Sequence, residues 1–342
     1  MSSSPLPFTQ LLTALLLVPC AAQATVRTWP GTPPCHHTVQ NCLIGVNPGD
    51  IVEIASNAVI DESLLIEDRL VSLRAAEGFH PVLAAGRNLI VDYSPSATGF
   101  AVPFELVYSG LTFAGGRFEF STTRLGSAIV ERMDITQSGS TAGLFVGTFA
   151  ADSGSATDLI VRENRVRASL GTQQAVSINL LSPAQVLFED NVIEAQPGTP
   201  TPGAARVALS VLGTTGNGSI EIRRNRIVAT TDPDAIVSRL RRGVNLAPFG
   251  AGSAFEIRVI DNLIDIGIDG TDVGISSSLS SGIHRYDIIN NTLRGVGRGI
   301  ALFDSSPMQN AVTAHINNNI VARPTNATPA EGLVWTAGHP TI

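Results

Sequence analysis

The chain has 342 residues, of which 15% are charged, and its formal net charge is −7. All 22 basic residues are arginine, so no lysine is present to serve as a catalytic base or to form a Schiff base. The negative net charge disfavours nucleic acid as a partner. With 32 glycines, 20 prolines and no long apolar stripe of helical period, the composition indicates an all-β chain.

Residues 1–24 are predicted to be a signal peptide. The apolar run at 11–18 has the length of a signal-peptide core, and Ala22-Gln23-Ala24 matches an A-x-A cleavage site. The run is too short to span a bilayer. Cys20 lies in a stretch that also resembles a lipoprotein cleavage box, so lipidation of Cys20 is the alternative. We expect cleavage after Ala24 and a secreted, periplasmic or cell-surface protein with no integral membrane segment left after cleavage.

Residues 25–48 are assigned to an N-terminal segment or cap. Two cysteines remain there after removal of the leader, Cys35 and Cys42, and two cysteines in an exported protein suggest a disulfide that closes a small loop. His36 and His37 lie between them, so a metal site is the alternative. Adjacent histidines on an extended segment point in opposite directions, and closing ligands at ordinary spacing are missing. We therefore expect a disulfide and no metal.

A short phrase repeats from about residue 104 to residue 322. Its clearest copy, Ile220 to Ile227, reads apolar, any, apolar, any, any, Asn, any, apolar. The asparagines in this frame are Asn164, Asn191, Asn225, Asn262, Asn291 and Asn318. Neighbouring asparagines lie 27 to 37 residues apart, a spacing that indicates stacked supersecondary units with loops of variable length between them.

Within each copy, the apolar residues alternate as they do in a strand, and the alternation slips by one just before the asparagine. The slip predicts a tight bend, and asparagine tolerates the left-handed backbone region better than most residues. In stacked coils about 4.8 Å apart, the asparagine amides would form a hydrogen-bonded ladder. In the last and weakest copy, Thr313/His315/Asn318/Ile320, the frame places His315 in a core position.

A second strand follows each copy and usually begins with glycine, as in Gly243-Val244-Asn245-Leu246 and Gly299-Ile300-Ala301-Leu302. With these features the chain resembles the right-handed parallel β-helix superfamily, the fold of pectate lyases and polygalacturonases. The resemblance implies an all-β, right-handed, single-stranded parallel β-helix, a solenoid of roughly eight to ten coils, over residues 49–323. Residues 324–342 are expected to form a C-terminal tail or an incomplete last coil.

In carbohydrate-active members of that superfamily, the substrate lies along the face of the strand that carries the glycine phrase. By alternation, the resemblance implies that the candidate ligand-binding residues on this face are Ser177, Asn179, Ser210, Asn245 and Ser276. None of these residues is an acid or a base, whereas acid–base cleavage of a glycosidic bond needs two carboxylates and β-elimination needs a positioned base. We therefore expect a non-catalytic scaffold that binds an extracellular polysaccharide or a cell-surface component.

The alternative is a polysaccharide lyase or glycoside hydrolase with a non-standard site. Asp190, Arg224 and Asp261 each precede a repeat asparagine, so neighbouring coils would stack acid, arginine and acid. Such a stack could transfer protons or bind sugar, although a surface ion-pair ladder of small energetic value is the expectation. The run Arg239 to Arg242 could also clamp an acidic sugar, since guanidinium groups bind carboxylates with two hydrogen bonds.

A calcium loop is the remaining cofactor candidate. Asp265, Asp269, Gly270 and Asp272 lie close together, but the EF-hand spacing is not met and a bidentate glutamate is missing. No cofactor is therefore expected.

Overall fold

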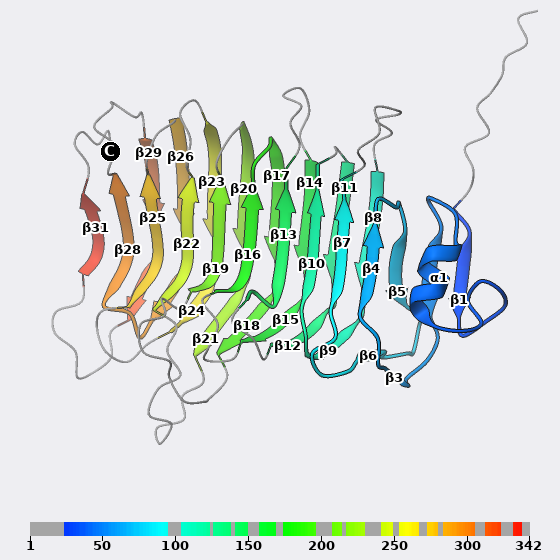
Figure 1. Ribbon diagram of the computed structural model, residues 1–342. Coiled ribbons are helices and arrows are strands. Elements are labelled where there is room, and N and C mark those ends of the chain that lie inside the picture. The colour runs from blue at the N-terminus through cyan, green and yellow to red at the C-terminus, as the bar shows by residue number, and fades with distance from the viewer. Residues whose placement is uncertain are drawn as a thin grey trace, which may run out of the picture.

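Parallel strands make up most of the molecule in the computed structural model (Figure 1). The structure describes residues 24–94, 104–123, 126–137, 141–149, 157–168, 174–195, 207–213, 217–229, 241–248, 253–266, 272–279, 283–304, 312–322 and 331–336. Most of the predicted signal peptide, with Cys20, lies outside the described residues. No helix in the described ranges combines the length and apolar character needed to cross a membrane.

The first sheet has 11 strands, all paired in parallel. In spatial order they are β1 (Val26–Trp29), β2 (Ile51–Ile54), β5 (Ser72–Ala75), β8 (Phe104–Ser109), β11 (Gly126–Glu131), β14 (Thr157–Arg162), β17 (Ala184–Glu189), β20 (Asn217–Arg223), β23 (Ala254–Ile260), β26 (Ile283–Ile289) and β29 (Val312–Asn317).

The second sheet has 10 strands. They are β4 (Leu64–Glu67), β7 (Leu89–Tyr93), β10 (Phe118–Thr122), β13 (Leu144–Thr148), β16 (Gln174–Leu180), β19 (Val207–Gly213), β22 (Arg242–Pro248), β25 (Val273–Leu279), β28 (Arg298–Asp304) and β31 (Glu331–Thr336). The last of these strands lies in the segment expected to be a tail or an incomplete coil.

The third sheet also has 10 strands, which are shorter. They are β3 (Val59–Ile60), β6 (Val82–Leu83), β9 (Thr112–Gly115), β12 (Asp134–Gln137), β15 (Arg165–Ala168), β18 (Val192–Ala195), β21 (Arg226–Ala229), β24 (Leu263–Asp265), β27 (Thr292–Arg294) and β30 (Ile320–Ala322).

Each turn of the chain adds one strand to each sheet, so a strand bonds to strands one turn earlier and one turn later. Figure 1 shows the resulting stack, which runs from α1 and β1 at one end to β31 at the other. The predicted parallel β-helix is confirmed, and its strand count lies at or just above the upper end of the predicted number of coils.

Alternation along each strand places one set of side chains inside the coil. In β20, Ile220 and Ile222 are buried, and in-register stacking puts Ile220 beside Val186 of β17 and Ile257 of β23. Each such side chain contributes roughly 1.5 to 3 kcal/mol through removal from water. The repeated apolar positions of the sequence are therefore the core of the solenoid.

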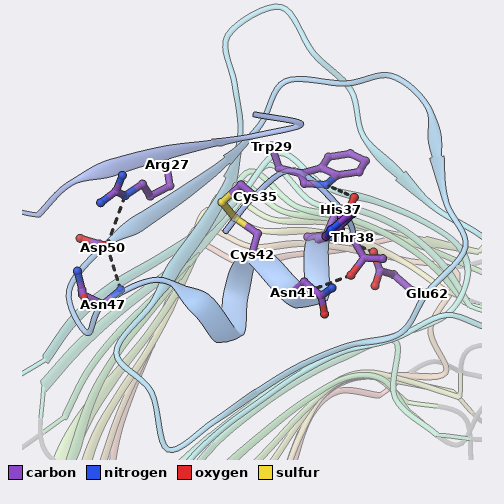
Figure 2. Close-up of a disulfide and its surroundings, with 11 residues drawn as sticks. Arg27, Trp29, Cys35, His37, Thr38, Asn41, Cys42, Asn47, Asp50 and Glu62 are labelled. Carbon is purple, nitrogen blue, oxygen red and sulfur yellow. Dashed lines mark hydrogen bonds and ion pairs between the residues drawn. A yellow bond between two sulfur atoms is a disulfide. The ribbon is translucent and has the colours of Figure 1, made fainter. Parts of the chain in front are cut away.

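Helix α1 (Val39–Gly45) lies at the N-terminal end of the stack, where a cap is needed to cover apolar core. The Thr38 side chain accepts a hydrogen bond from the Asn41 amide at 3.0 Å, and Val39, Cys42 and Leu43 are buried. Cys35 and Cys42 form a disulfide, which ties the helix to the segment that precedes it (Figure 2). The sequence assigned a cap to this region without a helix, because the helical stretch is so short.

The ladder asparagines are buried at the bend between the first and third sheets. The described members are Asn164, Asn191, Asn225, Asn262 and Asn291. Asn225 is typical: its Oδ1 accepts bonds from the backbone amide and Nδ2 of Asn191 at 2.9 and 3.0 Å, and its Nδ2 donates to Oδ1 of Asn262 and to the Phe188 carbonyl, both at 3.0 Å. Every amide thus joins three coils.

Two details of the predicted ladder are wrong. The left-handed residue is the one before each ladder position, with φ from 54° to 58° in the seven coils that begin with Arg132, which precedes Met133. In the last coil, Asn318 takes this left-handed position and Asn319 joins the ladder, its Oδ1 accepting from Asn291 Nδ2 at 2.9 Å. Three consecutive asparagines, with polar residues in the preceding strand, left the register of this copy undetermined by pattern alone.

Replacing Asn225 with alanine should destabilise the solenoid strongly. The substitution removes the acceptor of two Asn191 donors and the donor to the Phe188 carbonyl, all of them buried, so we expect a loss of about 3 kcal/mol in the free energy of unfolding. Urea unfolding followed by circular dichroism measures this loss. Asn217→Ala, at an exposed asparagine that begins β20, the strand before Asn225, serves as the control. Equal urea midpoints for the two variants would show that the ladder contributes no stability.

Candidate functional site

The outer face of the second sheet carries the five predicted ligand-binding residues. The strand register aligns one outward row across β13 to β28, made of Phe145, Ser177, Ser210, Asn245, Ser276 and Ala301. Asn179 belongs to the next outward row, beside Gly147. Four of the five predicted residues therefore lie side by side.

The expected exposure of this row is wrong. Ser177, Ser210 and Ser276 expose only 5%, 0% and 3% of their surfaces, and Asn245 exposes 9%. The Ser210 hydroxyl and the Asn179 Oδ1 have no hydrogen-bond partner among the described residues. Alternation decides which side of a sheet a residue faces, but it carries no information about what covers that side. Only those members of the row that line a cavity can contact a ligand.

One cavity, here named the Phe145 cavity, lies over β10, β13 and β16. Its volume is about 350 Å³, and it is lined by Arg117, Glu119, Thr141, Ala142, Phe145, Gln174 and Ser177. Arg117 and Glu119 form an ion pair at 2.7 Å, so the charges of this cavity compensate each other. A Cβ at the neighbouring Gly147 would lie 3.0 Å from the Phe145 ring and 2.6 Å from the Phe149 ring, so glycine is required for these rings to adopt their positions.

A second cavity, here named the arginine cavity, lies over β22, β25 and β28. Its volume is about 310 Å³, and it is lined by Arg241, Arg242, Asn245, Val273, Ser276, Ser277, Ser278, Arg298 and Phe303. Asn245 Oδ1 accepts hydrogen bonds from Arg242 at 2.9 Å and from the Ser276 hydroxyl at 3.0 Å. The predicted Arg239 lies outside the described residues, whereas Arg241 and Arg242 reach the cavity directly.

The three weak catalytic candidates do not form the predicted acid–arginine–acid stack. Arg224 makes a two-pronged ion pair with Asp190, at 2.7 and 2.9 Å, and contacts Glu189 at 2.6 Å. Asp261 makes no ion pair within the described part of the chain. The Arg224 side chain points toward the preceding coil, because that coil contains the carboxylates of both Glu189 and Asp190.

The Asp190–Arg224 pair is poorly suited to proton transfer. The hydrogen bond from Arg224 holds the pKa of Asp190 below its usual value, and the bond to Asp190 raises the pKa of Arg224. Asp190 therefore stays ionised and bound to its partner, whereas a general acid or base needs a pKa near the working pH. The two side chains are 41% and 45% exposed, as expected of a surface ion pair.

A longer ionic row on the outer face of the first sheet was not recognised in the sequence. The position two residues before each ladder position reads Glu131, Arg162, Glu189 and Arg223 in successive coils, and the strand register aligns these side chains. Glu131 and Arg162 lie 2.7 Å apart, and Glu189 and Arg223 lie 2.8 Å apart. In the sequence, the charge at this repeat position alternates between negative and positive, and this alternation is the signal that could have revealed the row.

Burial by itself would raise the pKa of Glu131, but hydrogen bonds and charges from Arg162 and Arg132 outweigh it and lower that pKa. Glu131 is therefore a charged group that the fold stabilises in its ionised form.

His315 is on the surface, in contrast to its predicted core position. The inward residues of this strand are Val312, Ala314 and Ile316, one position out of register with the predicted frame. The His315 side chain is 53% exposed, and its Nδ1 lies 3.1 Å from Oδ1 of Asp287. Arg285 Nε is 3.5 Å from the same carboxylate oxygen.

Among the described residues, no group of three or more His, Cys, Asp or Glu side chains is placed to hold a metal ion. Asp269 and Gly270 of the predicted calcium loop lie outside the described residues. No protein-family model, curated protein or solved structure matches the chain at a significant level, so its function has to be inferred from the geometry described above.

The ionic row predicts a specific acid sensitivity. Because the folded-state pKa of Glu131 is lowered, its contribution to stability is present above the pKa of the unfolded chain and is lost as pH falls through the folded-state value. Between about pH 5 and pH 3, the urea midpoint of the native chain should therefore fall more steeply than that of Glu131→Gln. Glu256→Gln, at an exposed glutamate without an ion pair among the described residues, should follow the native slope. If the urea midpoints of all three proteins fell equally steeply with pH, Glu131 would not be the source of the acid sensitivity.

Proposed function

We propose that the protein is an exported, non-catalytic scaffold that binds an extracellular polysaccharide or a cell-surface glycan on the outer face of its second sheet. The observation that carries the proposal is the pair of cavities on this one face. Each is lined by hydroxyl, amide and guanidinium groups together with a phenylalanine, a combination that suits the hydroxyl-rich edge and the apolar face of a sugar ring.

The lining of the two cavities also supports a binding role without catalysis. Glu119 is the single carboxylate among their described lining residues, and it is engaged by Arg117. Glycosidic cleavage by the common mechanisms uses two carboxylates on opposite sides of the bond. The described residues of these cavities do not provide that pair.

Two further observations agree with export. The Cys35–Cys42 disulfide suits an oxidising compartment, where such bonds persist. The N-terminal sequence has the features of a signal peptide. Outside the cell, polysaccharides and cell-surface components are the partners that a solenoid of this kind would meet.

Binding of the full chain to a panel of neutral and acidic polysaccharides should be saturable and should weaken about tenfold in Phe145→Ala, because the variant loses one aromatic contact with the sugar. Isothermal titration measures the affinity. Ile320→Ala, at an exposed residue of the third sheet, is the control and should bind normally. The proposal fails if no polysaccharide binds, or if the native chain cleaves one.

A polysaccharide lyase or glycoside hydrolase is the second candidate, and one observation favours it. The carboxylate of Asp287 lies beside Nδ1 of the exposed His315, the arrangement that orients an imidazole as a general base.

If this pair is catalytic, the native chain should release reducing ends or unsaturated products from a polysaccharide, and His315→Ala should lower the rate by about a hundredfold or more. Arg294→Ala, at an exposed residue of β27 in the third sheet, is the control. Absence of product from the native chain over the whole panel excludes this candidate.

A further inference from the structure

The arginine cavity differs from the Phe145 cavity in its charge balance. Among the described residues, neither Arg241 nor Arg242 lies within ion-pair distance of a carboxylate, and Arg298 pairs with Glu331 at 2.9 Å. Within the described part of the chain, one of the three guanidinium groups thus has a carboxylate partner. In the Phe145 cavity the single arginine is matched by Glu119 at 2.7 Å.

This cationic site is local, because the chain as a whole carries a net charge of −7. On an acidic protein, an unspecialised surface would repel anions. The described lining residues of this cavity include three arginines and no carboxylate. Elsewhere in the described chain, arginines such as Arg162 and Arg223 lie beside a carboxylate.

The strand register places the arginines on two sides of the cavity. Arg242, Val273 and Arg298 are neighbours on β22, β25 and β28, so the two arginines are two strand spacings apart, about 10 Å at the backbone. Val273, which is 8% exposed, separates them. Their flexible side chains can thus approach one bound group from opposite sides.

Polar contacts hold part of this arrangement in place before any ligand arrives. Asn245 Oδ1 accepts from both Arg242 and the Ser276 hydroxyl, so the guanidinium is tied to the floor of the cavity. A group held in position loses less conformational entropy on binding. Phe303 and Ser278 are neighbours in the next outward row and add a ring and a hydroxyl to the same cavity.

We propose that the arginine cavity binds a sugar residue that carries an oxyanion, either a carboxylate or a sulfate ester, with Arg241, Arg242 and Arg298 around the anion and Phe303 against the sugar ring. Guanidinium groups bind planar and tetrahedral oxyanions through paired, charge-assisted hydrogen bonds. The aromatic ring and the serine hydroxyls distinguish a charged sugar from a bare anion. This inference rests on the proposed function and names the class of ligand for one of its two cavities.

The test uses the full chain and four probes: glucose, glucuronate, glucose 6-sulfate and inorganic sulfate. Affinities measured by isothermal titration or by NMR titration should be about tenfold or more higher for the charged sugars than for glucose, the factor that a charge-assisted hydrogen bond contributes. Higher salt concentration should weaken the binding of the charged sugars and leave the binding of glucose unchanged. The carboxylate and sulfate probes show which oxyanion the cavity prefers.

Arg242→Gln should remove most of this preference. Arg226→Gln removes the same charge from an exposed residue of the third sheet, and should behave as the native chain. Circular dichroism melts check that both variants keep the fold. Phe303→Ala should weaken the binding of both charged sugars and leave the binding of inorganic sulfate unaffected.

Three results would overturn the inference. They are equal affinity for glucose and the charged sugars, equal behaviour of Arg242→Gln and Arg226→Gln, and binding of inorganic sulfate as tight as that of the charged sugars. If charged sugars do not bind but polysaccharides still bind through Phe145, the inference fails and the proposed function stands. If no glycan binds, both fail.

Discussion

The buried asparagine ladder is the constraint on which the rest of this solenoid depends. Each ladder amide is surrounded by protein, so its donors and acceptor have to be satisfied by the coils before and after it. A slip of one residue between coils would leave several buried polar groups unpaired, at about 1 to 3 kcal/mol each. Apolar alternation alone tolerates a slip of two residues, because the same side would still be apolar. The ladder removes that freedom and thereby defines which side chains stack above one another.

A fixed register gives each outer face its own chemistry. On the first sheet, glutamate and arginine alternate from coil to coil, so neighbouring charges attract along the row from Glu131 to Arg223. On the second sheet, small polar residues occupy the corresponding row, and cavities form at two places along it. Along the row of the first sheet the charges pair with one another. The second face retains guanidinium groups without carboxylate partners among the described residues, and this difference is why the second face is the better candidate for a ligand.

Prediction from the sequence succeeded where one local pattern was repeated clearly and failed where the pattern was ambiguous. Five ladder asparagines were identified because each follows a strand with apolar residues in alternate positions. The last copy has threonine and histidine in those positions and three adjacent asparagines, so the pattern wrongly favours Asn318 over Asn319 and wrongly predicts that His315 is buried. The serine row was assigned to the correct side of the sheet, but its burial could not be predicted, since covering groups come from elsewhere in the chain.

The sequence by itself determined the fold class, the repeat frame and the identity of most core and ladder positions, because these depend on alternation and on a recurring bend, which are local properties. The tertiary structure alone decided which polar residues meet. Arg224 pairs with Asp190 and not with Asp261, and Arg241, Arg242 and Arg298 come together around one cavity although they lie in different coils. Such contacts depend on side-chain direction and on the stacking of segments about thirty or more residues apart, which no single stretch of sequence encodes.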